Sequence, residues 1–312
     1  MADTKIRGYK IDFMRWSWPA VVLSAVLSVV SLVSLGWQGL NFAIDFTGGT
    51  IIEVAYQEPA DLEEVRQQLK DAGFANPIVQ HFGTTREVLI RLSPQEDMTN
   101  TDLRTRVMDA LRKDPAVQVE LHRIEFVGPQ VGEDLAESGV VALLLAVLGI
   151  LAYVAWRFEY RFSFGAIVAS VHDIVLILGV FSVFQLEFDL SVLAAVLAIL
   201  GYSINDTIVI FDRIRENFRK IRRGEVLDII NLSINETLSR TLMTSFLTLL
   251  VCIAMAIWGG EVLRNFSLAL IVGIVVGTYS SIYVASALAY WLGVSRADLL
   301  LPEKEGATDN RP

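Results

Sequence analysis

Six long apolar runs constrain this chain more than any other feature of its sequence. Hydrophobic residues make up 53% of the chain, and each run is close to the ~20 residues that a helix needs to cross a membrane. The sequence therefore predicts an α-helical membrane protein with six spans and both termini on one side. The expected spans are Trp18–Trp37, Val140–Trp156, Phe164–Phe184, Leu190–Phe211, Leu242–Trp258 and Phe266–Leu292.

The first run follows basic residues, as the apolar part of a secretory signal peptide does. It is longer than such a segment usually is, and it ends in Gly36-Trp37 rather than in a small-residue cleavage site. We interpret residues 18–37 as an uncleaved first transmembrane helix.

The distribution of charge predicts the orientation of the spans. Basic residues gather in the N-terminal segment 1–17, after the second span and in the link 213–240 between spans four and five. The links Gln185–Ser191 and Gly259–Asn265 contain a single basic residue, Arg264. By the positive-inside rule, segment 1–17, the basic link and the tail 293–312 are cytoplasmic.

The first expected span is followed by residues 38–134, the largest segment outside the spans. The other five spans lie within residues 138–292. Segment 38–134 has 17 acidic and 9 basic residues, a balance that disfavours nucleic acid as a partner. The orientation places it on the outer face of the membrane. The only cysteine, Cys252, lies in the fifth expected span and has no partner for an internal disulfide.

The outer segment alternates between strand and helix patterns. β-branched and alternating residues indicate strands, and apolar residues at helical spacing indicate two helices. His81 and His122 lack metal-ligand spacing, and we expect neither a metal nor a cofactor. The order β-α-β-β-α-β predicts a ferredoxin-like α+β domain, with elements at Thr50–Tyr56, Ala60–Ala72, Pro77–Phe82, Glu87–Leu92, Thr101–Leu111 and Val117–Val127.

Asp206 is a carboxylate inside the fourth apolar run. An Asp at the centre of a membrane helix costs roughly 2.5–3.5 kcal/mol on insertion scales, and such residues usually have a function. Protons are the expected cargo, because burial favours the neutral form of a carboxyl group. The alternative is a structural Asp that only forms hydrogen bonds to neighbouring helices.

His172 and Asp173 form a second polar site, in the third span. They could join a proton relay with Asp206 or bind the facing helix, and the sequence does not separate these alternatives. A Ser-His-Asp hydrolase is disfavoured, because no nucleophile motif is present. An intramembrane aspartyl protease is disfavoured as well, because Gly201–Asp206 lacks the Gly-x-Gly-Asp pattern.

Two further features have ordinary structural interpretations. Arg240, at the cytoplasmic end of the fifth span, is typical of a residue that extends to lipid headgroups, although it could also balance a buried carboxylate. Small residues recur every four positions in span six, with Gly273, Gly277 and Ser281 among them. Such a ridge lets two helices approach closely, and its partner could be span three, span four or another chain.

Glycine-containing segments flank the outer domain at Asp45–Thr50 and Phe126–Gly132. Glycines at these positions permit turns with positive φ, and the simplest interpretation is a linker that joins a mobile domain to the membrane. No Lys-Ser/Thr follows Gly48-Gly49, which excludes a P-loop.

The motifs together closely resemble the SecF branch of the SecD/SecF family of bacterial protein-export membrane proteins, within the RND superfamily. The resemblance covers nearly the whole chain in the family's order, including the His-Asp pair. The matching segments are FAIDFTGG (42–49), FVGPQVG (126–132), GYSINDTIVIFDRIREN (201–217), FRKIRRG (218–224), LSRTLMTS (238–245) and SSIYVASALA (280–289).

This resemblance implies a multi-pass subunit of the bacterial inner membrane that assists Sec-dependent protein translocation by using the proton-motive force. It implies SecD, the SecYEG translocon and unfolded secretory proteins as partners, with YajC and YidC as further candidates. Asp206 matches the family's proton-path aspartate and Arg240 its functional arginine. Asp45, Gly48, Gly49 and Asn205 lie in the family's motifs.

Two other functions stay open beside this one. An RND small-molecule exporter would use the same buried carboxylate, although such proteins have about twelve spans and two large outer domains. A scaffold that only stabilises SecD would need the small-residue ridge but not Asp206.

Overall fold

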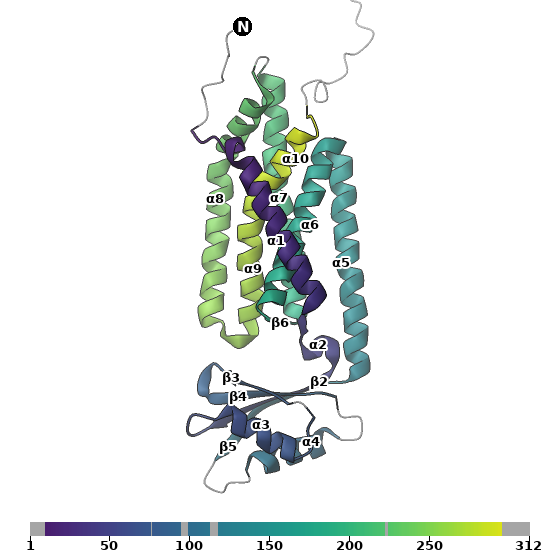
Figure 1. Cartoon of the computed structure of the whole chain (residues 1–312), viewed down its shortest axis with the longest axis vertical. Coiled ribbons are helices and arrows are strands. Elements are labelled where there is room, and N and C mark those ends of the chain that lie inside the picture. Colours follow the sequence, from purple (N-terminus) through teal and green to yellow (C-terminus); the bar gives the residue numbers. More distant parts are fainter. Residues whose placement is uncertain (1–9, 76, 95–98, 113–117, 222–223, 295–312) are drawn as a thin grey trace, which may run out of the picture.

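A computed structural model describes residues 10–75, 77–94, 99–112, 118–221 and 224–294. Its long helices stand side by side in a bundle, and a small sheet domain lies beyond one end of that bundle (Figure 1). Within the described part of the chain, six helical segments are long and apolar enough to cross a membrane. The remaining parts of segments 1–17 and 293–312, and Arg222 and Arg223 of the basic link, lie outside the described residues.

The membrane helices are longer than their apolar runs. Helix α1 (Ser17–Trp37) follows its run closely, and α6 (Tyr160–Val183) begins slightly early. Helix α5 already begins at Pro129 and ends at Arg157, because proline is favoured in the first turn. Helices α7 (Leu190–Lys220) and α8 (Val226–Trp258) extend into the basic link from either side, where side-chain hydrogen bonds from Asn217 to Ser233 and Glu236 hold them together.

The last span is not one continuous α-helix. Helix α9 (Gly260–Ser280) runs into a π-helical segment, Ser281–Ala285, before α10 (Ser286–Trp291) completes the span. Helices α6, α7 and α9 form the centre of the bundle, where about half of each span is buried. Helices α1, α5 and α8 are mostly exposed, and their exposed side chains are largely apolar, as a lipid or protein environment requires.

The domain between α1 and α5 is a four-stranded antiparallel sheet with two helices on one face. Sheet order is β3-β4-β2-β5, so each helix connects two strands that have another strand between them. Two-residue strands β1 (Asn41–Phe42) and β6 (Glu187–Phe188) pair in parallel nearby. The main elements are β2 (Gly49–Tyr56), α3 (Leu62–Asp71), β3 (Ile78–Phe82), β4 (Thr84–Leu92), α4 (Asn100–Leu111) and β5 (Val119–Val127).

Most expected elements of this domain occur within two or three residues of their predicted ends. The β3–β4 turn is tighter than predicted, because Gly83 adopts a φ of 75° and β4 already begins at Thr84. Helix α3 begins after Asp61, whose side chain accepts a hydrogen bond from the backbone N–H of Glu63 at 2.9 Å, a standard helix cap. Val117, the expected start of the last strand, lies outside the described residues.

The two faces of the sheet have different surroundings. Residues such as Ile52, Val88 and Ile90 pack against α3 and α4 in an apolar core. The opposite face is turned toward the membrane bundle (Figure 1) and borders a cavity of about 600 Å³. The sheet domain therefore contacts the bundle through the face that its own helices leave uncovered.

Candidate functional site

Polar side chains from α6, α7 and the end of α9 meet inside the bundle. Asp173 of α6 accepts hydrogen bonds from Ser203 of α7 at 2.5 Å and from Ser280 of α9 at 2.9 Å. His172 Nδ1 lies 3.0 Å from the other carboxylate oxygen of Asp173. Asp173 is 1% exposed, so this carboxylate holds three central helices together where water has little access.

Asp206 lies one turn after Ser203 on the same helix and is only 4% exposed. Its Oδ2 atom is buried and has no hydrogen-bond partner among the described residues. A buried carboxylate oxygen without a partner is costly if it stays charged. Asp206 therefore differs from Asp173: one carboxylate is fixed by hydrogen bonds, and the other is not.

Arg240 is the residue that the sequence offered as a possible counter-charge for a buried carboxylate. It lies on α8, is exposed, and precedes Thr241, whose buried Oγ1 atom has no partner among the described residues. The Nε2 atom of His172 is buried without a partner as well. Polar atoms with unused hydrogen-bonding capacity thus occur on α6, α7 and α8.

The π-helical segment contributes hydroxyl groups to this site. Ser281 Oγ lies 2.8 Å from Thr207 Oγ1, next to Asp206 in the sequence, and 3.4 Å from the carbonyl oxygen of Ser203. Single π-turns inside α-helices occur frequently at functional sites. Here the π-turn begins directly after Ser280, so two successive serines reach Asp173 and Thr207.

Small residues allow the close approach of these helices. A Cβ atom at Gly273 would lie 2.5 Å from the side chain of Ile199, and one at Gly277 would lie 2.8 Å from the Cβ of Ser203. Gly273 and Gly277 of the ridge therefore pack on the fourth span, α7, while its later part, at Ala285, lies against the third span, α6. Gly165 of α6 has the same role, because its Cβ would lie 2.8 Å from the carbonyl oxygen of Ala285.

The segment around Asp45 is more ordered than a linker. Residues Ile44–Thr47 form the short helix α2, and Asp45 Oδ2 accepts a hydrogen bond from the backbone N–H of Leu190, the first residue of α7, at 3.0 Å. Gly48 and Gly49 have φ angles of 67° and 132°, a backbone conformation that glycine permits. Asn205, the remaining motif residue, is exposed on α7.

The glycines of the second segment do not use the positive φ that glycine permits. Gly128 has a φ of −65° and is the N-cap residue of α5. Gly132 does not have a positive φ either. Gly132 serves close packing instead, because a Cβ there would lie 2.8 Å from the backbone nitrogen of Gly48.

No hydrolase arrangement forms around His172. Ser203 donates to Asp173 rather than to the imidazole, so the serine has no base of the kind that a nucleophile needs. Among the described residues no cluster of His, Cys, Asp and Glu could hold a metal ion. His81 and His122 are both exposed.

Sequence reasoning missed two parts of this arrangement. Ser280 donates to Asp173, but a serine in an apolar helix carries no signal of its partner. The ion pair between Arg91 of β4 and Glu187 of β6 was missed as well. It joins residues far apart in the sequence, and no local pattern could have paired them.

The comparisons with known proteins agree with this architecture. Residues 107–295 match the family described as protein export membrane protein SecD/SecF, C-terminal, and residues 33–60 match the SecD/SecF GG motif. The protein translocase subunit SecF of Vibrio alginolyticus is 51% identical, over 95% of both chains. The SecF subunit of Pseudomonas aeruginosa is 48% identical, over 97% of this chain and 98% of its own.

Solved structures of SecDF have the same fold. The crystal structure of SecDF, a translocon-associated membrane protein from Thermus thermophilus, superposes with a TM-score of 0.82 at 37% identity over 94% of this chain. SecDF in a super-membrane-facing form gives a TM-score of 0.68 at 39% identity. This chain spans 40% of the SecDF chain in both comparisons. The chain therefore belongs to the SecD/SecF family of protein export membrane proteins.

Proposed function

We propose that this chain works as a SecF-type subunit in the bacterial inner membrane. Together with SecD, it uses the proton-motive force to assist the SecYEG translocon in moving unfolded secretory proteins across the membrane. The observation that carries this proposal is Asp206: a carboxylate 4% exposed, on a central helix, with an oxygen that no described residue satisfies. The names and high identity of the SecF relatives support the pathway.

The proposal includes the orientation of the chain across the membrane. With the basic ends of α5, α7 and α8 in the cytoplasm, both termini are cytoplasmic and the sheet domain is periplasmic. The strand order β3-β4-β2-β5 supports a ferredoxin-like domain. Residues 18–37 and 138–292 then form the spans, and residues 38–134 form the domain between the first two. YajC and YidC are further partners that the family resemblance leads us to expect.

Proton uptake by Asp206 would change the packing around it. The neutral group no longer interacts as a charge with Arg240, and Thr207 beside it is bonded to the π-turn through Ser281. One elementary charge crossing the membrane potential supplies about 2.3 kcal/mol per 100 mV. Each proton therefore delivers enough free energy for a modest displacement of α7 against α9. Asp173 and His172 would fix the neighbouring helices or extend the proton route.

The test is export of a secreted protein in inner-membrane vesicles that carry Asp206→Asn, with and without an imposed proton gradient. Asp212→Asn is the matched control, because Asp212 lies on the same helix but forms its ion pair with Arg157 at the end of the bundle. We expect Asp206→Asn to abolish stimulation by the gradient and Asp212→Asn to retain it, with SecD co-purifying in both cases.

The scaffold alternative makes the opposite prediction. If the Asp206→Asn chain exports at the normal, gradient-stimulated rate, the proposed function is wrong. A scaffold would instead lose SecD when the small-residue ridge is disrupted, as in Gly277→Ala, and would be indifferent to Asp206.

A further inference from the structure

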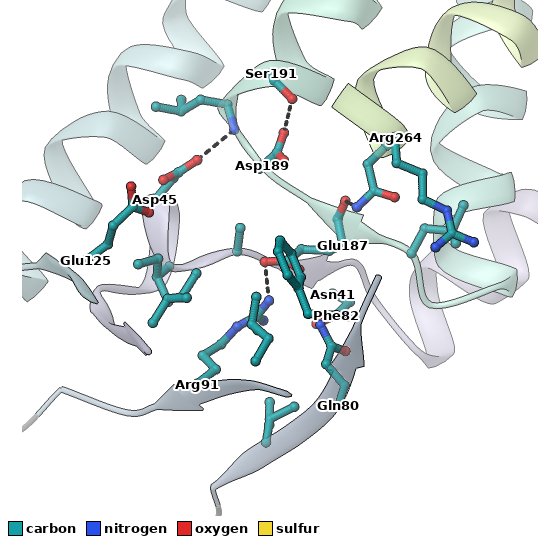
Figure 2. A pocket seen from close by; sticks show the side chains of 18 of the residues that line it. Asn41, Asp45, Gln80, Phe82, Arg91, Glu125, Glu187, Asp189, Ser191 and Arg264 are labelled. Carbon is teal, nitrogen blue, oxygen red and sulfur yellow. Dashed lines mark hydrogen bonds and ion pairs between the residues drawn. The ribbon is translucent and has the colours of Figure 1, made fainter. Parts of the chain in front are cut away.

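The outer end of α7 is tied directly to the sheet domain (Figure 2). Asp45 accepts a hydrogen bond from the backbone N–H of Leu190 at 3.0 Å, and Arg91 of β4 forms an ion pair with Glu187 in the α6–α7 connection. The parallel pairing of β1 with β6 brings the two segments together, and Ala43 donates to the carbonyl oxygen of Phe188 at 2.9 Å. We call Asn41–Asp45, Arg91 and Gln185–Leu190 the junction.

Charge at the junction favours these contacts. A helix N-terminus stabilises nearby carboxylates, and α7 has two of them: its own cap, Asp189, which accepts from the N–H of Val192 at 2.8 Å, and Asp45 from α2. The side chain of Arg91 is only 10% exposed. Breaking its pair with Glu187 would leave a largely buried charge without its partner, which costs more than losing an exposed ion pair.

Both chain connections of the sheet domain converge on α2. On one side, α2 leads through Gly48 directly into β2 at Gly49. On the other side, Gly132 of α5 packs so closely that an added Cβ would lie 3.1 Å from the carbonyl oxygen of Phe46. Helix α2 therefore contacts α7 through Asp45 and also lies next to both chain connections of the sheet domain.

Helix α7, which the junction contacts at Leu190, also carries Asp206. Leu190 and Asp206 are separated by about 24 Å along α7, at 1.5 Å per residue. Because a helix transmits displacement along its axis much better than a loop, a shift of α7 around Asp206 arrives at Leu190.

We propose that Asp45 and Arg91 are positioning residues that transmit movement of α7 to the sheet domain through Leu190 and Glu187. The inference rests on the proposed function, since it assigns a route to the displacement that proton uptake by Asp206 starts. Without these contacts the proton step still occurs, but the sheet domain no longer follows it.

The test uses the full chain with SecD in lipid vesicles and a charge exchange. Arg91→Glu breaks the ion pair, and Arg91→Glu combined with Glu187→Arg rebuilds it with reversed charges. Asp45→Asn is an independent second variant that weakens the helix cap with little change of shape. Arg123→Glu is the matched control, because Arg123 borders the same cavity but pairs with Glu53 inside the sheet domain.

The first readout is the distance between spin labels on the sheet domain and the bundle, at Thr101→Cys and Trp258→Cys in a Cys252→Ala chain. Both labelled positions are exposed. We expect Asp206→Asn to shift this distance in the otherwise unchanged chain and in the Arg123→Glu chain. The shift should disappear with Arg91→Glu or Asp45→Asn and return in the exchanged double variant.

The second readout is gradient-stimulated export. It should fall to the unstimulated rate in Arg91→Glu, and the double variant should recover it. If Arg91→Glu and Asp45→Asn keep both the distance shift and the stimulation, or if the double variant recovers neither, the junction does not transmit the movement. These outcomes refute the role of the junction alone. The proposed function itself would be refuted by normal gradient stimulation in the Asp206→Asn chain.

Discussion

Replacing Gly277 by alanine tests the packing that the site depends on. The added Cβ would lie 2.8 Å from the Cβ and 2.9 Å from the Oγ of Ser203. Ser203 has little freedom to move aside, because its hydroxyl donates to Asp173 at 2.5 Å. Either α9 shifts away from α7 or this hydrogen bond is lost.

The expected cost follows from three contributions. Overpacking a well-packed core costs about 1–3 kcal/mol, and the alternative, a lost hydrogen bond to a carboxylate, costs about 1.5–3 kcal/mol. Alanine regains about 1 kcal/mol of helix propensity relative to glycine. Subtracting this gain from either cost, we expect the bundle to lose about 0.5–2 kcal/mol.

Labelling of the cysteine side chain can measure this loss of stability. Cys252 is the only cysteine of the chain, is 2% exposed, and packs in a cluster with Ile199, Ala269 and Ile274 of α7 and α9. A thiol-reactive fluorogenic dye therefore labels it when the bundle opens. We expect the labelling transition of Gly277→Ala to occur at a lower temperature than that of the unchanged chain.

Gly201→Ala is the matched control, because it makes the same substitution on α7. A Cβ at Gly201 meets no atom within 4 Å, so its transition should be unchanged or slightly higher. An equal or higher transition temperature for Gly277→Ala would refute the close packing of α9 on α7.

Three further predictions concern single side chains. Ser280→Ala removes a donor to the Asp173 carboxylate and should lower the same labelling transition by an amount that corresponds to about 1.5–3 kcal/mol; no change would mean that Asp173 does not need this contact. Tyr56→Phe removes a buried hydroxyl that has no hydrogen-bond partner in the described part of the chain. Since burial, followed by Glu64, raises the pKa of Tyr56 to about 12, the fold loses stability above pH 10 as the unfolded tyrosine ionises first. Tyr56→Phe should therefore unfold less readily in alkaline urea titrations, and greater sensitivity to alkali would contradict this. Burial also raises the pKa of Glu187 from 4.5 against the opposing effect of Arg91, so the folded state keeps a proton that the unfolded chain has released. Stability should fall as pH rises through the window above 4.5, and Glu187→Gln should flatten that dependence in denaturant titrations; an unchanged slope would contradict it.

Local patterns in the sequence predicted the elements of the fold well. Apolar runs long enough to cross a membrane became helices, and the alternation in residues 50–127 became strands and helices in the predicted order. The helix ends were less predictable. Polar residues such as Arg213 and Glu236 continue α7 and α8 beyond their apolar runs, because these residues form ion pairs with each other.

Contacts between distant segments could not be predicted from local pattern. Asp206 was singled out because a carboxylate in an apolar run is a local signal. The partners of Asp173 come from α7 and α9, and one of them depends on where the last span changes to a π-turn. In the same way, a Gly-Gly pair indicates a turn, but not that Asp45 beside it caps α7 from another part of the chain.

Proton flux through Asp206 is the most direct test of the account. Vesicles containing this chain and SecD would be loaded with a pH-sensitive dye, given a proton gradient, and compared with and without a polypeptide arrested in the translocon. The account predicts that the arrested polypeptide increases proton flux in the unchanged chain and in Asp212→Asn, and that Asp206→Asn removes this increase. An increase of equal size in the Asp206→Asn vesicles would contradict the claim that Asp206 carries the protons that drive export.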